Sequence, residues 1–270
     1  MANSQLETVN LTIENGVAWV TLNRPEVYNA FNTKMQDELF GIWRSLRDDD
    51  SVGAAVLTAS GDKAFCTGID RDEAMGQAEF SYAEAGSEIH FDDPGERLGP
   101  KQADLWKPVV AAVNGMACGG AFYMLGECDI IICADHATFF DPHVSYGMTS
   151  TYETVHMFHK MPFGELVRMQ LLGVNERISA QRAYEIGLVS EVAPAGELQD
   201  RARWIAETIA AAPRAAVQAT LRTAWACQEM SREQALGVCN AFLTLGRSDD
   251  ALKQGQDAFS SGERPKPRIR

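Results

Sequence analysis

The sequence predicts an α/β fold, because short apolar runs with strand character alternate with segments of helical periodicity. The runs at residues 54–58, 109–113 and 129–134 each have the length of one buried strand. Strands that alternate with helices form parallel crossover units. From residue 196 the strand pattern stops, and Ala- and Leu-rich helical periodicity continues. We therefore expect a core over residues 1–195 and a helical C-terminal region over residues 196–270.

The N-terminal segment predicts a hairpin followed by one amphipathic helix. Residues 11–22 form two strand-like runs around Asn15-Gly16, a dipeptide that tolerates the positive φ of a two-residue turn. In the next segment, TKMQDELFGIWRSL, apolar residues recur on one helical face. Thr33 and Gln36 have the spacing of a capping box at its start. Further on, the polar, aperiodic stretch at residues 81–99 predicts a long loop that covers a site.

Composition and charge exclude several classes of protein. The chain has 270 residues and a net charge of −13, which argues against binding nucleic acid or an anionic membrane surface. It contains neither the ~18 apolar residues of a membrane span nor the basic and apolar start of a signal peptide, so we expect a cytoplasmic protein. The six cysteines have no CxxC spacing, and we expect them to be reduced, with no metal site.

The candidate chemistry lies in two glycine-containing turns. FCTGID (65–70) and NGMACGGA (114–121) both follow strand-like runs, and none of the common nucleotide-binding, zinc-protease or serine-hydrolase motifs is present. Glycine lets backbone N–H groups approach a ligand closely. Two such turns can therefore direct two N–H donors at one oxygen atom.

Five segments in order resemble the crotonase superfamily, the enoyl-CoA hydratase/isomerase family, across about residues 10–260. The segments are NRPEVYNAFN (23–32), FCTGID (65–70), KPVVAAVNGMACGGA (107–121), CDIIICADHATF (128–139) and ISAQRAYEIGLVSEV (178–192). The resemblance implies a ββα-spiral core, a C-terminal helical region that builds homotrimers or hexamers, and an acyl-CoA thioester as the substrate. It implies no separate cofactor, since coenzyme A is part of the substrate.

The resemblance also assigns roles to residues. Ile69 and Gly120 match the two backbone donors of the family's oxyanion hole, which stabilises the enolate or tetrahedral oxyanion of a thioester. The positions of the two glutamates of the family's hydratases hold Tyr123 and His143 instead. We therefore expect His143 to act as the acid or base, with Glu153, ten residues on, as its partner and Tyr123 as a further hydrogen-bond donor.

The substrate-binding residues follow from two of the same segments. The resemblance places Arg24, Val27 and Ala30 along the pantetheine and nucleotide end of CoA, and Ala64 and Cys66 near the adenine. Asp70 directly follows the first oxyanion donor. These segments favour a CoA thioester over a free diketone as the ligand.

Three functions remain open at this stage. The first is an atypical hydratase or isomerase of acyl-CoA thioesters, in which His143 transfers protons. The second is a carbon–carbon bond hydrolase of β-dicarbonyl compounds, in which His143 and Glu153 activate water. The third is a catalytically silent family member that binds CoA esters.

Overall fold

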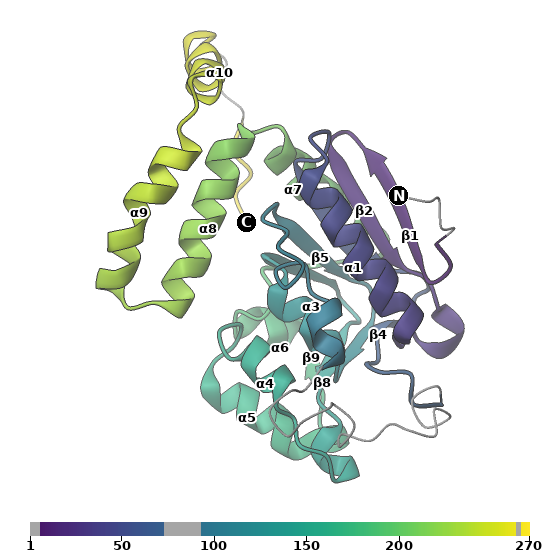
Figure 1. Ribbon diagram of the computed structural model, residues 1–270. Coiled ribbons are helices and arrows are strands. Elements are labelled where there is room, and N and C mark those ends of the chain that lie inside the picture. The colour runs from purple at the N-terminus through teal and green to yellow at the C-terminus, as the bar shows by residue number, and fades with distance from the viewer. Residues whose placement is uncertain (1–5, 73–92, 263–265) are drawn as a thin grey trace.

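The computed structural model describes residues 6–72, 93–262 and 266–270 (Figure 1). Most of the predicted loop at residues 81–99 lies outside the described residues, which resume at Asp93. None of the helices in these three stretches is long and apolar enough to cross a lipid bilayer.

The larger of two sheets has six strands in the order β1-β2-β3-β5-β7-β10. The first two strands form the predicted antiparallel hairpin around Asn15-Gly16, and every later pairing in this sheet is parallel. The predicted strands are thereby confirmed. The bounds are β1 (Val9–Glu14), β2 (Val17–Leu22), β3 (Ala54–Ala59), β5 (Val109–Val113), β7 (Ile130–Ala134) and β10 (Glu191–Ala193).

The second sheet is small, with the strand order β4-β6-β8-β9. Each of its first three strands comes a few residues after a strand of the large sheet, so the chain repeats a long strand, a short strand and a helical segment. This repeat is the ββα spiral that the family resemblance implies. The bounds are β4 (Ala64–Cys66), β6 (Met116–Cys118), β8 (Thr138–Phe140) and β9 (Ile178–Ser179).

Short helical segments connect the strands. The α-helices of the core are α1 (Thr33–Asp48), α3 (Ala121–Glu127), α4 (Tyr152–Met157), α5 (Phe163–Leu172) and α6 (Ala180–Glu185). The 3-10 turns are η1 (Pro25–Val27), η2 (Pro94–Arg97), η3 (His143–Tyr146), η4 (Gly173–Asn175) and η5 (Ala195–Glu197).

Strands β2, β3, β5 and β7 of the large sheet are buried on both faces, as their almost wholly apolar sequences require, whereas most of the edge strand β1 is exposed. One face packs on α1 through the predicted apolar stripe, which includes Met35, Leu39, Ile42 and Leu46. The other face packs on α7 (Leu198–Ala210), whose Leu198, Ala202 and Ala206 join a second apolar cluster. Helix α7 therefore covers the second face of the sheet, although its sequence belongs to the helical C-terminal region.

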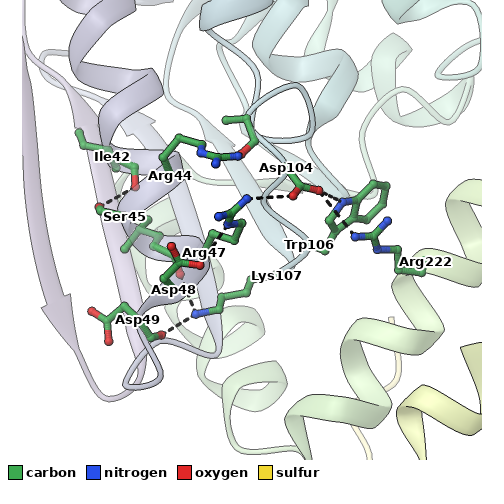
Figure 2. A network of polar contacts seen from close by, with 12 residues as sticks. Ile42, Arg44, Ser45, Arg47, Asp48, Asp49, Asp104, Trp106, Lys107 and Arg222 are labelled. Carbon is green, nitrogen blue, oxygen red and sulfur yellow. Dashed lines mark hydrogen bonds and ion pairs between the residues drawn. The ribbon is translucent and has the colours of Figure 1, made fainter.

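The remaining C-terminal helices stand apart from the sheets (Figure 1). They are α8 (Arg214–Glu229), α9 (Arg232–Gly246) and α10 (Asp249–Ser260). Polar contacts join α8 to the core: Arg222 lies 3.7 Å from Asp104 and stacks on Trp106 (Figure 2). Asp104 also binds Arg47 of α1, at 3.0 Å.

The start of α1 differs from the predicted capping box. Asn32, not Thr33, is the N-cap residue, and its side-chain oxygen accepts a hydrogen bond from the backbone N–H of Met35 at 3.0 Å. Thr33 is already the first helical residue. The capping-box prediction was therefore wrong by one residue, because apolar periodicity does not tell which of two adjacent cap-forming residues leaves the helical conformation.

Replacement of the N-cap residue tests this assignment. We expect Asn32→Ala to lower the free energy of unfolding by about 1 kcal/mol, because the Met35 N–H loses its acceptor. Thr33→Ala is the matched control and should change the stability much less. Urea denaturation of both variants measures the difference, and a larger loss in Thr33→Ala would contradict the observed cap.

Candidate active site

Three turns from the sequence analysis meet at one edge of the small sheet. Ile69 follows β4, Gly120 follows β6 and His143 follows β8. These strands are parallel neighbours. Because the carboxyl ends of parallel strands lie at the same edge of a sheet, the three turns leave the sheet side by side.

Glycine is required where these turns approach one another. Gly68 has φ +86°, and a Cβ atom on it would lie 3.0 Å from the backbone nitrogen of Gly120. Gly119 has φ +54°, and a Cβ atom there would lie 3.6 Å from Cε1 of His143. The turn after β6 is thus in contact with both of its neighbours.

The backbone of the first turn is oriented by a parallel bridge between Phe31 and Ile69. Phe31 donates to the carbonyl of Gly68 and accepts from the N–H of Asp70. Since a parallel bridge bonds the two neighbours of the central residue, the N–H of Ile69 points away from Phe31. Among the backbone hydrogen bonds of the described turns, none uses the N–H of Ile69 or of Gly120.

His143 is fixed by a buried aspartate. Its Nδ1 lies 2.6 Å from Oδ1 of Asp141, which also accepts the backbone N–H of His143 at 3.0 Å. The other carboxylate oxygen, Oδ2, accepts the hydroxyl of Ser150 at 2.7 Å. Asp141 is fully buried. Because three donors satisfy it, its pKa stays below the usual range despite the burial that would raise it.

The other ring nitrogen of His143 faces Glu153, with 3.4 Å between Nε2 and Oε1. Glu153 is in the first turn of α4 and is buried, whereas Thr151, at the spacing of eight residues, is exposed. The structure therefore brings together the predicted pair of His143 and Glu153. The turn η3 and Gly147, with φ +72°, lie between these two residues.

Tyr123 completes this cluster. Its side chain lies beside the carboxyl groups of Glu153 and of Asp93, a buried residue that precedes η2. The ring packs against Phe31 and Tyr152, with centroids 6.5 and 6.4 Å away. Burial and the two nearby carboxyl groups raise the pKa of Tyr123, so the phenol remains protonated at neutral pH.

The environment shifts the pKa of both proton-transfer candidates upward. For Glu153 the dominant cause is burial, which disfavours the carboxylate. For His143 burial alone would lower the pKa, but the hydrogen bond and charge of Asp141 and the charges of Glu153 and Asp93 outweigh it. The two raised pKa values favour the retention of a proton within the cluster.

The predicted substrate-binding residues lie in two adjacent segments. Arg24 forms an ion pair with Asp70 at 2.8 Å and donates to the carbonyl of Ala30 at 2.7 Å. Val27, at the end of η1, is half-buried. Ala64 and Cys66 are buried in β4, so their side chains pack in the core. Their contacts with a ligand stay predictions.

Asn29 holds these two segments together, a role that the sequence did not reveal. It has φ +55°, and its side-chain amide donates to the carbonyls of Ser60 and Ala64 at 3.0 and 2.9 Å. Its side-chain oxygen accepts the N–H of Arg24 at 2.9 Å. The early turn is thus pinned beside β4.

Asp141 and Asp93 are the two acidic residues that sequence reasoning missed. Asp141 had a detectable signal, a charged residue at the end of the apolar strand FFDPH, two positions before His143. Asp93 had none, since it follows a polar, aperiodic stretch and reaches the site only in three dimensions.

The same side chains include the donor types of a cation site. Asp141, His143 and Glu153 each offer one ligand atom within 4.8 Å of the others. However, two ligands of a tetrahedral zinc ion with bonds of ~2.0 Å lie about 3.3 Å apart. The 2.6 Å between Asp141 and His143 is instead the length of a charge-assisted hydrogen bond. The contact between Asp141 and Nδ1 of His143 therefore fits a shared proton and not two ligand atoms of one ion.

Comparisons with known proteins show the family of this chain. The enoyl-CoA hydratase/isomerase family matches the chain over residues 12–268. The chain belongs to this family. It is accordingly an acyl-CoA-processing enzyme of the crotonase superfamily, similar to enoyl-CoA hydratases.

Individual relatives match this chain over almost its whole length. (E)-benzylidenesuccinyl-CoA hydratase of Thauera aromatica is 35% identical over 97% of this chain and 98% of its own length. Carnitinyl-CoA dehydratase of Proteus mirabilis is 32% identical, with 96% of this chain and 97% of its own covered. An enoyl-CoA hydratase/isomerase structure from Mycobacterium paratuberculosis superposes with a TM-score of 0.83 at 33% identity, covering 98% of this chain and 99% of its own.

Proposed function

We propose that this family member adds water reversibly to the double bond of an enoyl-CoA thioester, with His143 and Glu153 as the two proton-transfer groups. The observation that carries the proposal is the 3.4 Å between Nε2 of His143 and Oε1 of Glu153, beside the turns of Ile69 and Gly120. The relatives that are called a hydratase and a dehydratase support the reaction class. We assign to this pair the roles of the two glutamates of the family's hydratases, whose positions hold Tyr123 and His143 here.

The proton balance of this reaction fits the pair. Nε2 of neutral His143 takes a proton from water while the oxygen of that water bonds to the β-carbon. The electrons of the double bond move toward the thioester carbonyl, and the resulting enolate takes a proton at the α-carbon from the carboxyl group of Glu153. The imidazolium then returns a proton to the Glu153 carboxylate, which a distance of 3.4 Å permits after a small movement. The enzyme is thereby restored.

The backbone supplies the charge stabilisation. We assign the N–H groups of Ile69 and Gly120 to the oxyanion of the thioester, because both belong to adjoining turns and neither is used in the turns' backbone hydrogen bonds. Fixed N–H dipoles of this kind contribute about 3–4 kcal/mol each when their removal is measured in enzymes. Arg24, Val27, Ala30, Ala64, Cys66 and Asp70 belong to the proposed CoA-binding region.

Crowding one of these turns tests the oxyanion assignment. We expect Gly68→Ala to lower kcat by ~10²-fold or more, because the new methyl group would lie 3.0 Å from the Gly120 nitrogen and displace that donor. Gly187→Ala is the matched control, since Gly187 has φ +82° but no atom within 4 Å of an added Cβ. Steady-state kinetics should show a loss of kcat in the first variant alone. Equal kcat in both would contradict the assignment.

The acid–base pair predicts a bell-shaped pH profile of kcat/KM. The active form carries one proton on the pair of His143 and Glu153. At low pH a second proton blocks His143, the base. At high pH the loss of the remaining proton leaves Glu153 unable to act as the acid. Because the pKa of His143 is raised, the basic limb should lie above the reference value of ~6.5. His143→Ala should lower turnover by about 10²–10⁴-fold while the Kd for the CoA ester changes only a few-fold.

A panel of substrates makes this measurement decisive. It should contain benzylidenesuccinyl-CoA, crotonyl-CoA, the corresponding 3-hydroxyacyl-CoA thioesters and free β-diketones. Calorimetry gives the affinities, and Glu153→Gln tests the second group of the pair. Undiminished turnover in His143→Ala, or turnover of a diketone and of no thioester, would refute the proposal.

We also propose that the protein is a homotrimer or a hexamer. Large apolar side chains are exposed on α5, where Phe163 and Leu171 are 68% and 65% exposed, and on α9, where Leu243 is 67% exposed. Exposed apolar surface of this extent on two helices is typical of an interface.

Light scattering should therefore give three or six times the 29.6 kDa mass of the chain. Leu243→Asp should lower this mass, because an aspartate would lose its hydration in the interface. Ile13→Asp, on exposed strand β1, is the control and should leave the mass unchanged. A monomeric wild-type protein at micromolar concentration would contradict the proposal.

A further inference from the structure

We propose that Asp141 is a positioning residue, which holds His143 in the tautomer whose Nε2 lone pair faces the reacting atoms, and that Ser150 and Gln170 hold Asp141 in turn. This inference rests on the proposed function of His143. It concerns residues that touch neither the thioester nor the water in the reaction as written above.

The first step concerns the proton on Nδ1. Asp141 is fully buried, and its carboxylate accepts the backbone N–H of His143 and the hydroxyl of Ser150. A carboxylate satisfied by donors on both oxygens is an acceptor only. The contact of 2.6 Å to Nδ1 therefore requires a hydrogen on Nδ1. In the neutral ring this leaves Nε2 without a hydrogen, as a general base requires.

The second step concerns the direction of Nε2. The ring is held at Nδ1 on one side, while Cε1 lies close to Gly119 and Nε2 lies 3.4 Å from Glu153. Rotation of the ring by half a turn about χ2 would take Nδ1 away from Asp141. The hydrogen bond to Asp141 thus selects both the tautomer and the ring orientation of His143. Together they direct the lone pair of Nε2 toward Glu153.

The third step concerns what holds the aspartate. Ser150 donates to Oδ2 of Asp141 and accepts from Nε2 of Gln170 at 3.3 Å. The same amide donates to the hydroxyl of Thr154 at 2.6 Å, and that hydroxyl donates to the carbonyl of Ser150 at 2.7 Å. Gln170 is buried on α5. A layer of neutral hydrogen bonds from α4 and α5 therefore fixes the rotamer of Asp141.

The fourth step separates positioning from simple packing. The charged groups that face His143 are Asp141, Glu153 of α4 and Asp93 before η2. Of these, Asp141 alone contacts Nδ1. Loss of its charge should therefore change the titration of His143 as well as the rate, whereas loss of a packing contact would change only stability.

The chain offers a matched control in a second pair of Asp and His. Asp135 lies 3.5 Å from Nδ1 of His136, and both side chains are exposed. His136 contacts the carbonyls of Asp62 and Asn114 through Nε2 and is not part of the cluster. Asp135→Asn therefore removes an aspartate beside a histidine without touching the site.

The experiment combines kinetics with NMR of the full-length enzyme carrying ring-labelled histidine. The chain has five histidines, and His143→Gln assigns the signal of His143. In the wild type we expect a hydrogen on Nδ1 of neutral His143. Asp141→Asn should give a mixture of tautomers, a lower pKa of His143, a basic limb of kcat/KM at lower pH, and kcat reduced by ~10²–10⁴-fold with KM within a few-fold. Asp135→Asn should change none of these.

Further variants keep the inference falsifiable if Asp141→Asn does not fold. Ser150→Ala keeps the carboxylate but removes one of its donors, and it should reduce kcat by ~3–30-fold and shift the His143 titration in the same direction. Gln170→Leu should do the same by removing the donating amide without adding a charge. An unchanged tautomer and titration in the folded variants, or wild-type His143 with its hydrogen on Nε2, would overturn the inference.

The NMR readout needs no substrate, so it distinguishes the two proposals. If the wild-type enzyme hydrates no thioester while Asp141 still controls the tautomer of His143, the proposed function fails and the positioning role stands. If hydration depends on His143 but Asp141→Asn leaves the tautomer unchanged, the function stands and the positioning role fails.

Discussion

The parallel register of the short sheet β4-β6-β8 is the constraint on which the site depends. Each of these strands has only three residues, yet their pairing sets where Ile69, Gly120 and His143 leave the sheet. Two of the connections contain glycines with positive φ, and a Cβ atom on Gly68 would lie only 3.0 Å from the backbone nitrogen of Gly120. The large sheet, buried between α1 and α7, keeps these short strands in register because each follows one of its own strands.

The cluster around His143 places three carboxyl groups next to one imidazole in a buried setting, an arrangement that is unfavourable unless hydrogen bonds or protons compensate it. The compensation differs between the groups. Asp141 has several donors and remains ionised, whereas Glu153 has an upward-shifted pKa because burial dominates its environment. Two chemically similar side chains thereby have pKa values shifted in opposite directions, which suits the proposed roles of Asp141 in orienting the base and of Glu153 in donating a proton.

Local patterns in the sequence were sufficient for the hairpin, for three further strands of the large sheet and for helix α1, and the family resemblance was sufficient for the order of the turns. The Asn15-Gly16 hairpin and the apolar face of α1 follow from short-range rules that the structure confirms. The residues that escaped prediction depend on side-chain contacts that the local sequence pattern does not specify. Asp141 is satisfied partly by Ser150, which Gln170 of α5 supports, and Asp93 meets Tyr123 only after the spiral has closed. No periodicity records such contacts, because they fix side chains and not the path of the backbone.

In the proposed site, backbone groups stabilise charge and side chains transfer protons. This difference affects how such an enzyme can diversify. The proposed oxyanion donors are peptide N–H groups, and a substitution at Ile69 alters the side chain without deleting the donor. The proposed proton-transfer groups of His143 and Glu153 are instead side chains on segments that follow the sheet edge. Mutation can therefore exchange the proton-transfer groups while carbonyl polarisation is inherited unchanged. A lineage with this architecture can explore new reactions of one thioester without passing through forms that have lost the means to stabilise its enolate.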